Sequence, residues 1–417
     1  MKVLILNTSE RTGGAAVAAN RLMKALCKQG VEAKMLVRDK QSADERITSV
    51  NQSLWQRRLN FWRFAWERLV IFLSNKLDRK QLFRVSIANT GVDIARHPLV
   101  READVIHLHW VNQGFLSLES IRQLIATGKP IVWTMHDLWP ASSICHYAGQ
   151  CERYQASCGQ CFYLHSSRND LSSLIFRRKQ RIYDQAQIAF VCCSQWLRGR
   201  VALSQLLRQQ RLTAIPNPID QSLYRPQERT AARQALGLPL DKPLLLFGAL
   251  NINDERKGID YLGEALRRLP ADSVELVVFG QAKGPICELL PVKIHAMGYL
   301  SDDRTIASLY SAVDLYVTSS LEDNLPNTIM EALACGTPCV GFRTGGIPEM
   351  IDHAQNGYVA NYRDAADLAK GIEWVIRHPD PEALRQACVR KVQRCYAEPV
   401  VAQQYIALYE QLLKTHE

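Results

Sequence analysis

The feature that most constrains the fold is a regular alternation of short apolar runs and amphipathic segments along nearly all of the 417 residues. The apolar runs have the length of strands, and the segments between them show the three-to-four-residue spacing of helices. In the first half the predicted strands are 2–7, 32–37, 103–110, 130–136, 187–194 and 212–220, with helices over 13–30 and 118–128. Strands that alternate with helices form parallel sheets covered on both faces, so this half predicts a doubly wound α/β domain.

A second series of the same kind begins near Lys242. Its predicted strands are 243–250, 274–280, 293–300, 314–320 and 338–342, with helices over 258–270 and 303–313. The Pro-rich, polar segment 215–226 between the two series indicates a hinge, and the end of the chain has the pattern of an amphipathic helix. We therefore predict an N-terminal domain over 1–214, a C-terminal domain over 215–395, and a last helix, 396–417, that returns to the first domain.

Hydropathy and charge limit where the protein can be located and what kind of surface it can bind. No apolar run approaches the roughly 20 residues that a membrane-spanning helix needs, and the start of the chain turns polar too soon for a signal peptide. We therefore expect a cytoplasmic protein. The net charge is +10, and segment 52–84 alone contains eight basic residues and two acids. Such a patch favours an anionic surface, either a membrane or a nucleic acid.

The stretch 319–342 combines acidic residues with a predicted short helix. Pro326 suits the first turn of that helix, and Gly336 with the Pro that follows ends it. The free N–H groups of the first turn can receive an anion or a hydroxyl. Asp323 lies in the preceding loop and Glu331 about two turns into the helix, and a carboxylate suits the two O–H donors of a vicinal diol. The alternative is that these acids are solvated charges at a helix end.

This stretch resembles the signature of the retaining glycosyltransferases of family four. The signature consists of an acid, seven residues, a glutamate, a Gly-x-Pro step and Gly-Gly-x-Pro-Glu. Here the acids are Asp323 and Glu331, followed by "ACGTP" and by "GGIPE" at 345–349. The segments "GGAAVAANRL", "VWTMHD", "IPNPID", "RKGIDYLGEAL" and "MGYLSDDRTIASLYSAVDLYVTSS" also resemble the family, in the family's order.

The resemblance covers the chain except for 45–90 and 145–180. It implies an α/β GT-B fold, in which two Rossmann-like doubly wound domains face each other across a cleft. The first domain is expected to bind the acceptor, and the second is expected to bind a nucleotide sugar.

The resemblance also implies site residues. The catalytic residues are expected to be His136, Asp323 and Glu331. The donor-binding residues are expected to be Gly13, Gly14, Arg256, Lys257, Asn324, Leu325, Pro326, Asn327, Thr328 and Glu331. Two departures from the pattern matter: the first acid is usually a glutamate, and here Glu322 precedes Asp323. The family's Gly-Arg after the first strand of the second domain is Gly248–Ala249, so the diphosphate is expected to contact Arg256 and Lys257. Each of these assignments has an alternative. His136 would be a hydrogen-bonded histidine in a turn, and Gly13 and Gly14 would form a plain helix entry. Arg256 and Lys257 would be a solvated pair of cations.

The activity that the resemblance implies is transfer of a sugar with retention of anomeric configuration. The leaving phosphate would take the acceptor's proton, and fixed cations with helix N–H groups would stabilise its charge, so no cofactor is expected for catalysis. "DNLPNT" together with "HDLWP…CHYAGQCERY" resembles the glycosyltransferases of colanic-acid and other bacterial exopolysaccharide synthesis. The expected acceptor is a saccharide, in particular a lipid-linked one.

Four cysteines lie within 17 residues of one another. They are Cys145, Cys151, Cys158 and Cys161. The Cys-x2-Cys end of this cluster suits tetrahedral zinc, and four thiolates would leave no open position, so the sequence predicts a structural zinc. His146 is the alternative zinc ligand in place of one thiolate. Disulfides and free thiols are the alternatives.

Large apolar residues in segment 52–84 follow a helical stripe. Its members are Trp55, Leu59, Trp62, Trp66, Leu69, Leu73 and Leu77. Because arginines occupy other faces, the pattern favours a helix that lies on an anionic membrane surface, on the inner face of the cytoplasmic membrane. The alternative is an ordinary core helix with a solvated basic face.

Three other functions compete with glycosyl transfer. A nucleotide-sugar epimerase of the same fold would turn over without an acceptor. A nucleic-acid-binding protein would use the basic segment 52–84, but its tryptophans have helical spacing and the cleft residues would have no role, so we expect no nucleic-acid partner. A dinucleotide oxidoreductase is disfavoured because no Gly-x-Gly-x-x-Gly follows a strand.

Overall fold

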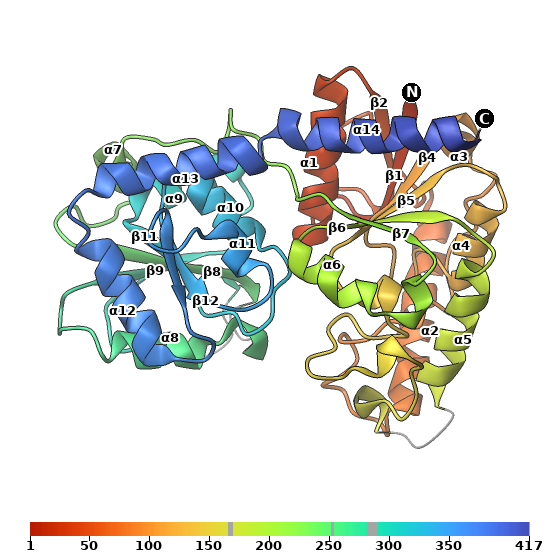
Figure 1. Ribbon diagram of the computed structural model, residues 1–417, viewed down its shortest axis with the longest axis horizontal. Coiled ribbons are helices and arrows are strands. Elements are labelled where there is room, and N and C mark those ends of the chain that lie inside the picture. Colours follow the sequence, from red (N-terminus) through yellow and green to blue (C-terminus); the bar gives the residue numbers. More distant parts are fainter. Residues whose placement is uncertain (166–169, 252–253, 282–289, 417) are drawn as a thin grey trace. The chain divides into compact units, whose positions relative to one another are not determined.

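The computed structural model describes residues 1–165, 170–251, 254–281 and 290–416 (Figure 1). The chain divides into two compact units. Unit 1 contains Met1–Pro216 together with Ala402–Glu417, and unit 2 contains Asn217–Val401. The division falls inside the Pro-rich segment 215–226, where the sequence predicts a hinge.

Unit 1 is built on a seven-stranded parallel sheet with the order β3-β2-β1-β4-β5-β6-β7. Its strands are β1 (Lys2–Ser9), β2 (Glu32–Asp39), β3 (Ile47–Ser49), β4 (Val105–Leu108), β5 (Ile131–Met135), β6 (Ile188–Cys192) and β7 (Arg211–Ala214). The chain enters at the centre with β1, moves to one edge, and returns to the other side of β1 with β4. Because the strands are parallel, their carboxyl ends meet at one edge of the sheet, where ligands of such sheets bind.

Helices cover both faces of this sheet (Figure 1). They are α1 (Gly14–Lys28), α2 (Leu54–Ser74), α3 (Pro98–Glu102), α4 (Leu118–Ile125), α5 (Leu171–Tyr183) and α6 (Gln195–Ala202). Local signals explain where several of them begin: the side chains of Ser53, Ser117 and Ser194 accept hydrogen bonds from the first turns of α2, α4 and α6. The core includes a cluster of rings in which Trp133 stacks on Phe190.

Unit 2 contains a six-stranded parallel sheet with the order β10-β9-β8-β11-β12-β13. Its strands are β8 (Leu244–Asn251), β9 (Glu275–Gln281), β10 (Ile294–Gly298), β11 (Leu315–Thr318), β12 (Cys339–Phe342) and β13 (Gly357–Ala360). Its helices are α7 (Arg229–Ala235), α8 (Ile259–Leu266), α9 (Asp303–Ala312), α10 (Asn327–Ala334), α11 (Ile347–Met350), α12 (Ala365–Ile376) and α13 (Pro381–Cys395). The predicted fold class, with two doubly wound α/β domains on parallel sheets, is therefore confirmed.

The last helix, α14 (Glu398–His416), contributes its residues from Ala402 onward to unit 1. Two tyrosines attach it to the sheet of that unit. Tyr405 Oη lies 2.9 Å from Thr134 Oγ1, and Tyr409 Oη lies 2.7 Å from His107 Nδ1. Unit 1 therefore depends on both ends of the chain.

Candidate active site

In unit 2 the loop between β11 and α10 holds most of the residues that the sequence singled out. Pro326 occupies the N-cap position of α10 and lacks an N–H, so the helix begins directly after it. Asn324 and Leu325, which belong to this loop, are buried. Thr328 Oγ1 accepts a hydrogen bond from Tyr316 Oη at 2.9 Å. The first turn of α10 is thereby fixed at the carboxyl end of β11, where its N–H groups can receive an anion.

Asp323 and Lys257 form an ion pair at this loop, with 2.8 Å between Asp323 Oδ2 and Lys257 Nζ. Lys257 belongs to the short 3₁₀ turn η5 (Glu255–Lys257). Two further hydrogen bonds connect this turn to the loop that follows β11. Leu321 N donates to Arg256 O at 2.7 Å, and Ser319 Oγ donates to Lys257 O at 2.8 Å. The structure thus brings Asp323 and Lys257 together although 66 positions separate them.

Arg256 has a different ion-pair partner from Lys257. Its guanidinium contacts both carboxylate oxygens of Asp254, the closer pair at 2.6 Å. Burial alone would raise the pKa of Asp254, but the hydrogen bonds and charge of Arg256 hold it below its ordinary value. Of the two cations predicted to contact a diphosphate, Lys257 is the one paired with a predicted site residue.

Glu331 points back from α10 and is buried, with 8% of its surface exposed. Tyr310 Oη of α9 donates to its Oε2 at 3.1 Å. Burial and then the charge of Glu331 raise the pKa of Tyr310 well above its ordinary value, so the phenol remains a donor. Asn327 Oδ1, one turn earlier, accepts from Asn217 Nδ2 at 3.1 Å. A buried carboxylate with one tyrosine donor is not a solvated helix-end charge.

The glycine motif after β12 fixes the loop that carries Asp323. Gly345 has φ of +58°, and a Cβ at this position would lie 1.6 Å from Asp323 O. Gly346 N donates to the same carbonyl at 3.2 Å. The "GGIPE" motif therefore shapes the backbone behind Asp323.

In unit 1, Gly13 and Gly14 follow the carboxyl end of β1. Gly13 is the N-cap of α1 and has φ of +91°, a conformation that side-chain-bearing residues rarely adopt. A Cβ on Gly13 would meet open space. The backbone at the start of α1 is therefore approachable, as a substrate-binding turn requires.

His136 follows β5 at the same edge of the unit 1 sheet. Its Nε2 lies 2.9 Å from His109 Nδ1, and its Nδ1 lies 3.5 Å from Cys193 Sγ. Burial lowers the pKa of His136 to about 4, against the attraction of the neighbouring Asp137. The imidazole is therefore neutral at physiological pH and can donate or accept a hydrogen bond without carrying charge. His136 lies in unit 1, whereas Asp323, Glu331 and Lys257 lie in unit 2.

Two other histidines are fully occupied by neighbours. His146 Nδ1 lies 2.6 Å from Asp137 Oδ2, and its Nε2 lies 3.0 Å from Ser86 Oγ. Both ring nitrogens of His146 therefore have partners in unit 1, and its role as a substitute zinc ligand stays a prediction. His107 contacts Tyr409 through Nδ1 and Thr134 through Nε2, so it connects α14 to β5.

The four clustered cysteines lie beside the core of unit 1. Burial raises the pKa of Cys145 to about 11 and those of Cys158 and Cys161 to about 12, and the neighbouring thiols add to each shift. Among the residues that the structure describes, no group of three or more His, Cys, Asp or Glu side chains meets the requirements of a metal site. The structural zinc stays a prediction.

Several site residues were missed by the sequence reasoning. Tyr310 and Tyr316 hold Glu331 and Thr328, and Asp137 joins His146 to Trp110, whose Nε1 donates to Asp137 Oδ2 at 3.0 Å. The sequence placed the tyrosines in a helix and a strand leading to the site, but spacing alone gives no signal that they contact it.

Comparisons with known proteins identify the family and the fold of the chain. The family model described as Glycosyltransferase Family 4 matches residues 12–223, and the one described as Glycosyl transferases group 1 matches residues 241–378. The D-inositol 3-phosphate glycosyltransferase of Xylanimonas cellulosilytica is 29% identical over 221 residues, which are 49% of this chain and 52% of that protein. The N-acetyl-alpha-D-glucosaminyl L-malate synthase of Bacillus anthracis is 25% identical over 213 residues, 49% of this chain and 54% of that protein. The chain spans about half the length of these curated relatives.

Solved structures show the same fold over the whole chain. Sucrose-phosphate synthase from Thermosynechococcus elongatus superposes with a TM-score of 0.69 at 19% identity and 99% coverage of both chains. Anabaena HepE, solved in complex with UDP and glucose, gives 0.64 at 18% identity, with 99% of this chain and 100% of that chain covered. These likenesses identify the GT-B fold.

Proposed function

Because the chain belongs to glycosyltransferase family 4, we propose that it transfers a sugar from a nucleoside-diphosphate donor to a saccharide acceptor with retention of anomeric configuration. The single observation that carries the proposal is the ion pair of Lys257 with Asp323, at the start of the helix that also carries the buried Glu331. These groups match the two chemical parts of a nucleotide sugar, a diphosphate and hydroxyl-rich rings.

We assign the roles as follows from chemistry. The diphosphate contacts Lys257, with Arg256 beside it, and the N–H groups at the start of α10. Glu331, whose Oε2 accepts from Tyr310 Oη, would accept hydrogen bonds from a vicinal diol, because a carboxylate matches the two O–H donors of such a diol. The 324–328 loop, Gly13 and Gly14 allow close backbone contact with the donor. The proposal needs no resident metal, because fixed cations and N–H groups stabilise the leaving charge.

His136 and Asp323 would orient the transferred sugar and stabilise the charge that develops on it. A neutral His136 suits a hydrogen bond to a sugar hydroxyl, and the negative Asp323 suits an oxocarbenium-like centre. The leaving phosphate then accepts the acceptor's proton on the same face, so the bond to the acceptor oxygen forms as the bond to the phosphate oxygen breaks.

Support for the substrates comes from chemistry and from relatives. HepE was solved with UDP and glucose, and the two curated relatives are named as a D-inositol 3-phosphate glycosyltransferase and an N-acetyl-alpha-D-glucosaminyl L-malate synthase. We propose a saccharide acceptor that is lipid-linked, of the kind built in exopolysaccharide synthesis such as that of colanic acid. The protein would then work at the cytoplasmic face of a membrane, with segment 52–84 toward the lipid.

The experiment that tests the proposal is a donor screen followed by product analysis. Purified protein is incubated with individual nucleotide sugars, and release of nucleoside diphosphate is measured with and without lipid-linked saccharides. The proposal predicts release that rises with an acceptor, and NMR of the product shows the donor's anomeric configuration. Interconversion of two nucleotide sugars without any acceptor would instead identify an epimerase.

A further inference from the structure

Helix α2 turns its polar side inward. Its fully buried residues are Asn60, Glu67, Arg68 and Ile71, three of which are polar or charged. A surface helix of a globular protein ordinarily buries an apolar stripe and exposes the polar one. The arrangement in α2 is the reverse.

Specific contacts fix this orientation. Glu67 Oε1 accepts hydrogen bonds from Ile87 N and Ala88 N, each at 2.9 Å, and Glu67 Oε2 lies 3.1 Å from Arg68 Nη2. Arg68 Nη1 also donates to Val85 O at 3.1 Å. A rotation of α2 would take Glu67 away from the N–H groups of Ile87 and Ala88 and Arg68 away from Val85 O, which are contacts that buried charges need.

The stripe predicted from the sequence therefore faces outward. Trp55 is 73% exposed, Trp62 67% and Trp66 56%. The other members of the stripe are exposed as well: Leu59, Leu69, Leu73 and Leu77. Leu54 and Phe61 of the same helix are also exposed. We call the exposed apolar residues of α2, together with Leu77 just after its end, the outer face of α2. Its members would be expected inside a core, so the alternative of an ordinary core helix is wrong, and contiguous exposed apolar surface of this kind marks an interaction site.

Positive charge surrounds the outer face. Arg57 and Arg58 lie at the start of the helix, and Lys76, Arg79 and Lys80 follow its end, all of them exposed. Of the two acids of segment 52–84, Glu67 is buried against Arg68, and Asp78 lies beyond the end of the helix, where it contacts Lys80 N and His165. Exposed tryptophan beside exposed cations is typical of a helix on an anionic lipid surface.

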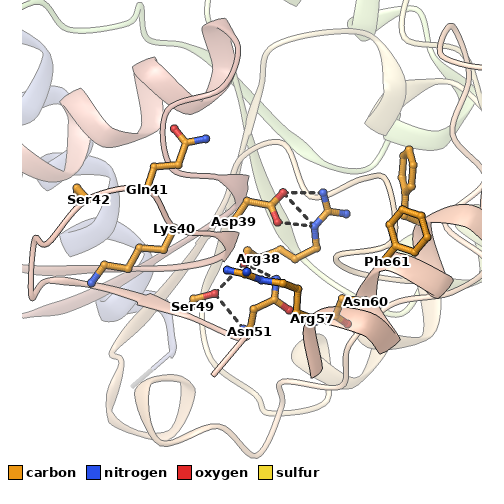
Figure 2. A pocket seen from close by; sticks show the side chains of 11 residues that line it. Arg38, Asp39, Lys40, Gln41, Ser42, Ser49, Asn51, Arg57, Asn60 and Phe61 are labelled. Atoms are coloured by element: carbon orange, nitrogen blue, oxygen red, sulfur yellow. Dashed lines mark hydrogen bonds and ion pairs between the residues drawn. The ribbon is translucent and has the colours of Figure 1, made fainter. Parts of the chain in front are cut away.

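A pocket of about 730 Å³ adjoins the outer face (Figure 2). It lies where β2 and β3 end at the carboxyl edge of the sheet, and the first half of α2 closes it. Phe61 belongs both to the pocket and to the outer face. The apolar surface is therefore continuous with the pocket.

The pocket itself carries excess positive charge. Its carboxylate, Asp39, is neutralised by Arg38, whose guanidinium contacts both carboxylate oxygens (Figure 2). Lys40 Nζ donates to the carbonyl oxygens of Asp44 and Ile47, at 2.8 and 2.7 Å. Among the residues that the structure describes, neither Lys40 nor Arg57 forms an ion pair with a carboxylate, so the pocket lining carries two further positive charges.

Hydrogen-bonding groups complete the pocket wall. Ser49 Oγ and Asn51 Nδ2 both donate to Arg38 O, and Asn60 Nδ2 donates to Asn51 Oδ1 at 2.6 Å. This network connects the ends of β2 and β3 to α2. Two cations in a polar wall match a phosphate better than they match a neutral sugar.

We propose that unit 1 docks on an anionic membrane through the outer face of α2, and that the adjoining pocket receives the phosphate of a lipid-linked acceptor. The identification of the bound lipid as an acceptor rests on the proposed function, whereas the membrane binding itself does not. The apolar face enters the lipid while Arg57 and Lys40 hold the phosphate at the level of the headgroups. This arrangement places the saccharide of the acceptor at the same edge of the sheet as Gly13 and His136.

Vesicle flotation of the full-length protein tests the proposal. We expect wild type to float with phosphatidylcholine vesicles that contain phosphatidic acid, and to bind pure phosphatidylcholine much more weakly. The triple variant Trp55→Ser, Trp62→Ser, Trp66→Ser should bind more than about tenfold more weakly. Arg57→Gln should lose roughly fivefold on the anionic vesicles alone. The matched control Tyr299→Ser, Tyr362→Ser, which removes two exposed aromatics of unit 2, should bind as wild type does.

Three outcomes would overturn the proposal. One is equal flotation of wild type and the tryptophan variant while both stay folded by circular dichroism. Another is a wild-type dimer in sedimentation that the tryptophan variant abolishes, because a second copy would then cover the outer face. The third is competition by inorganic phosphate alone that removes all binding, which would make the pocket a site for free phosphate. Vesicle binding without any nucleotide-sugar turnover would contradict the proposed function instead and leave the membrane site standing.

Discussion

Lys257 Nζ lies 2.8 Å from Asp323 Oδ2, and the backbone carbonyl of each residue accepts a hydrogen bond from a neighbouring loop. Asp323 O accepts from Gly346 N, while Lys257 O accepts from Ser319 Oγ. The pair therefore presents one positive and one negative group in a fixed relationship at the start of α10. A nucleotide sugar needs both: a cation at its diphosphate and an anion at the carbon where positive charge develops.

Replacing Lys257 by Met should lower the rate of donor cleavage by about 10²–10³-fold, the scale of losing one fixed group that stabilises developing charge. Arg256→Met is the comparison variant and should cost less, because Arg256 pairs with Asp254, which is not a predicted site residue, whereas Lys257 pairs with Asp323, which is one. Steady-state kinetics of nucleoside-diphosphate release measure both. Equal losses in the two variants would remove the distinction between the neighbouring cations.

Glu331→Ala should weaken donor binding by ~1–3 kcal/mol, the scale of hydrogen bonds to a charged group. Tyr310→Phe removes the tyrosine's hydrogen bond to the same carboxylate and should cost less, since the carboxylate remains. Calorimetric titration with the best donor compares the variants. Unchanged affinity in Glu331→Ala would exclude that residue from the donor site.

Gly345→Ala should disrupt the loop of Asp323 without touching any side chain of the site. The added Cβ would collide with Asp323 O, and a left-handed backbone costs a non-glycine residue roughly 1–2 kcal/mol even without a collision. We expect a lower melting temperature together with weaker donor binding. A fully active, equally stable variant would contradict the role assigned to this glycine.

The free energy of unfolding should fall as pH decreases from about 7.5 to about 5. Burial lowers the pKa of His136 to about 4 and that of His107 to about 3, whereas the unfolded chain protonates histidine near its ordinary value of 6.5. Below that value the unfolded state binds more protons than the folded state, so acid favours unfolding. Denaturant titrations at several pH values measure the slope, and His136→Gln should reduce it.

Purified protein should contain zinc if the four-cysteine prediction is right, and Cys158→Ser should lose it. Elemental analysis of the intact protein decides the point. Protein that is fully folded and free of metal would reject the structural zinc. It would leave four partly buried free thiols, and the raised pKa values of Cys145, Cys158 and Cys161 keep those three protonated.

Much of the fold follows from local patterns. Buried apolar runs predicted most of the strands, and Pro326 with Gly336 predicted the limits of α10. The short strand β3 was missed, because three residues give no periodicity. The sequence identified Gly345 as part of the "GGIPE" motif. Its contact with Asp323 arises only because two loops lie side by side at one edge of the sheet.

Other relationships depend on the tertiary fold. No spacing rule joins Lys257 to Asp323, or Tyr409 to His107 across 302 positions. The stripe of α2 was visible in the sequence, but its direction was not: the buried pair of Glu67 and Arg68 turns it outward, and that pair finds its partners only in the segment that follows the helix. The contacts of His146 with Asp137 and Ser86 were equally invisible.

The most direct test of the central claim is a calorimetric titration of a panel of nucleotide sugars into wild type and into the double variant Lys257→Met, Glu331→Ala. The account predicts that wild type binds at least one nucleotide sugar and that the double variant loses this binding while remaining folded. Equal binding by both proteins, or no binding of any nucleotide sugar by wild type, would contradict it.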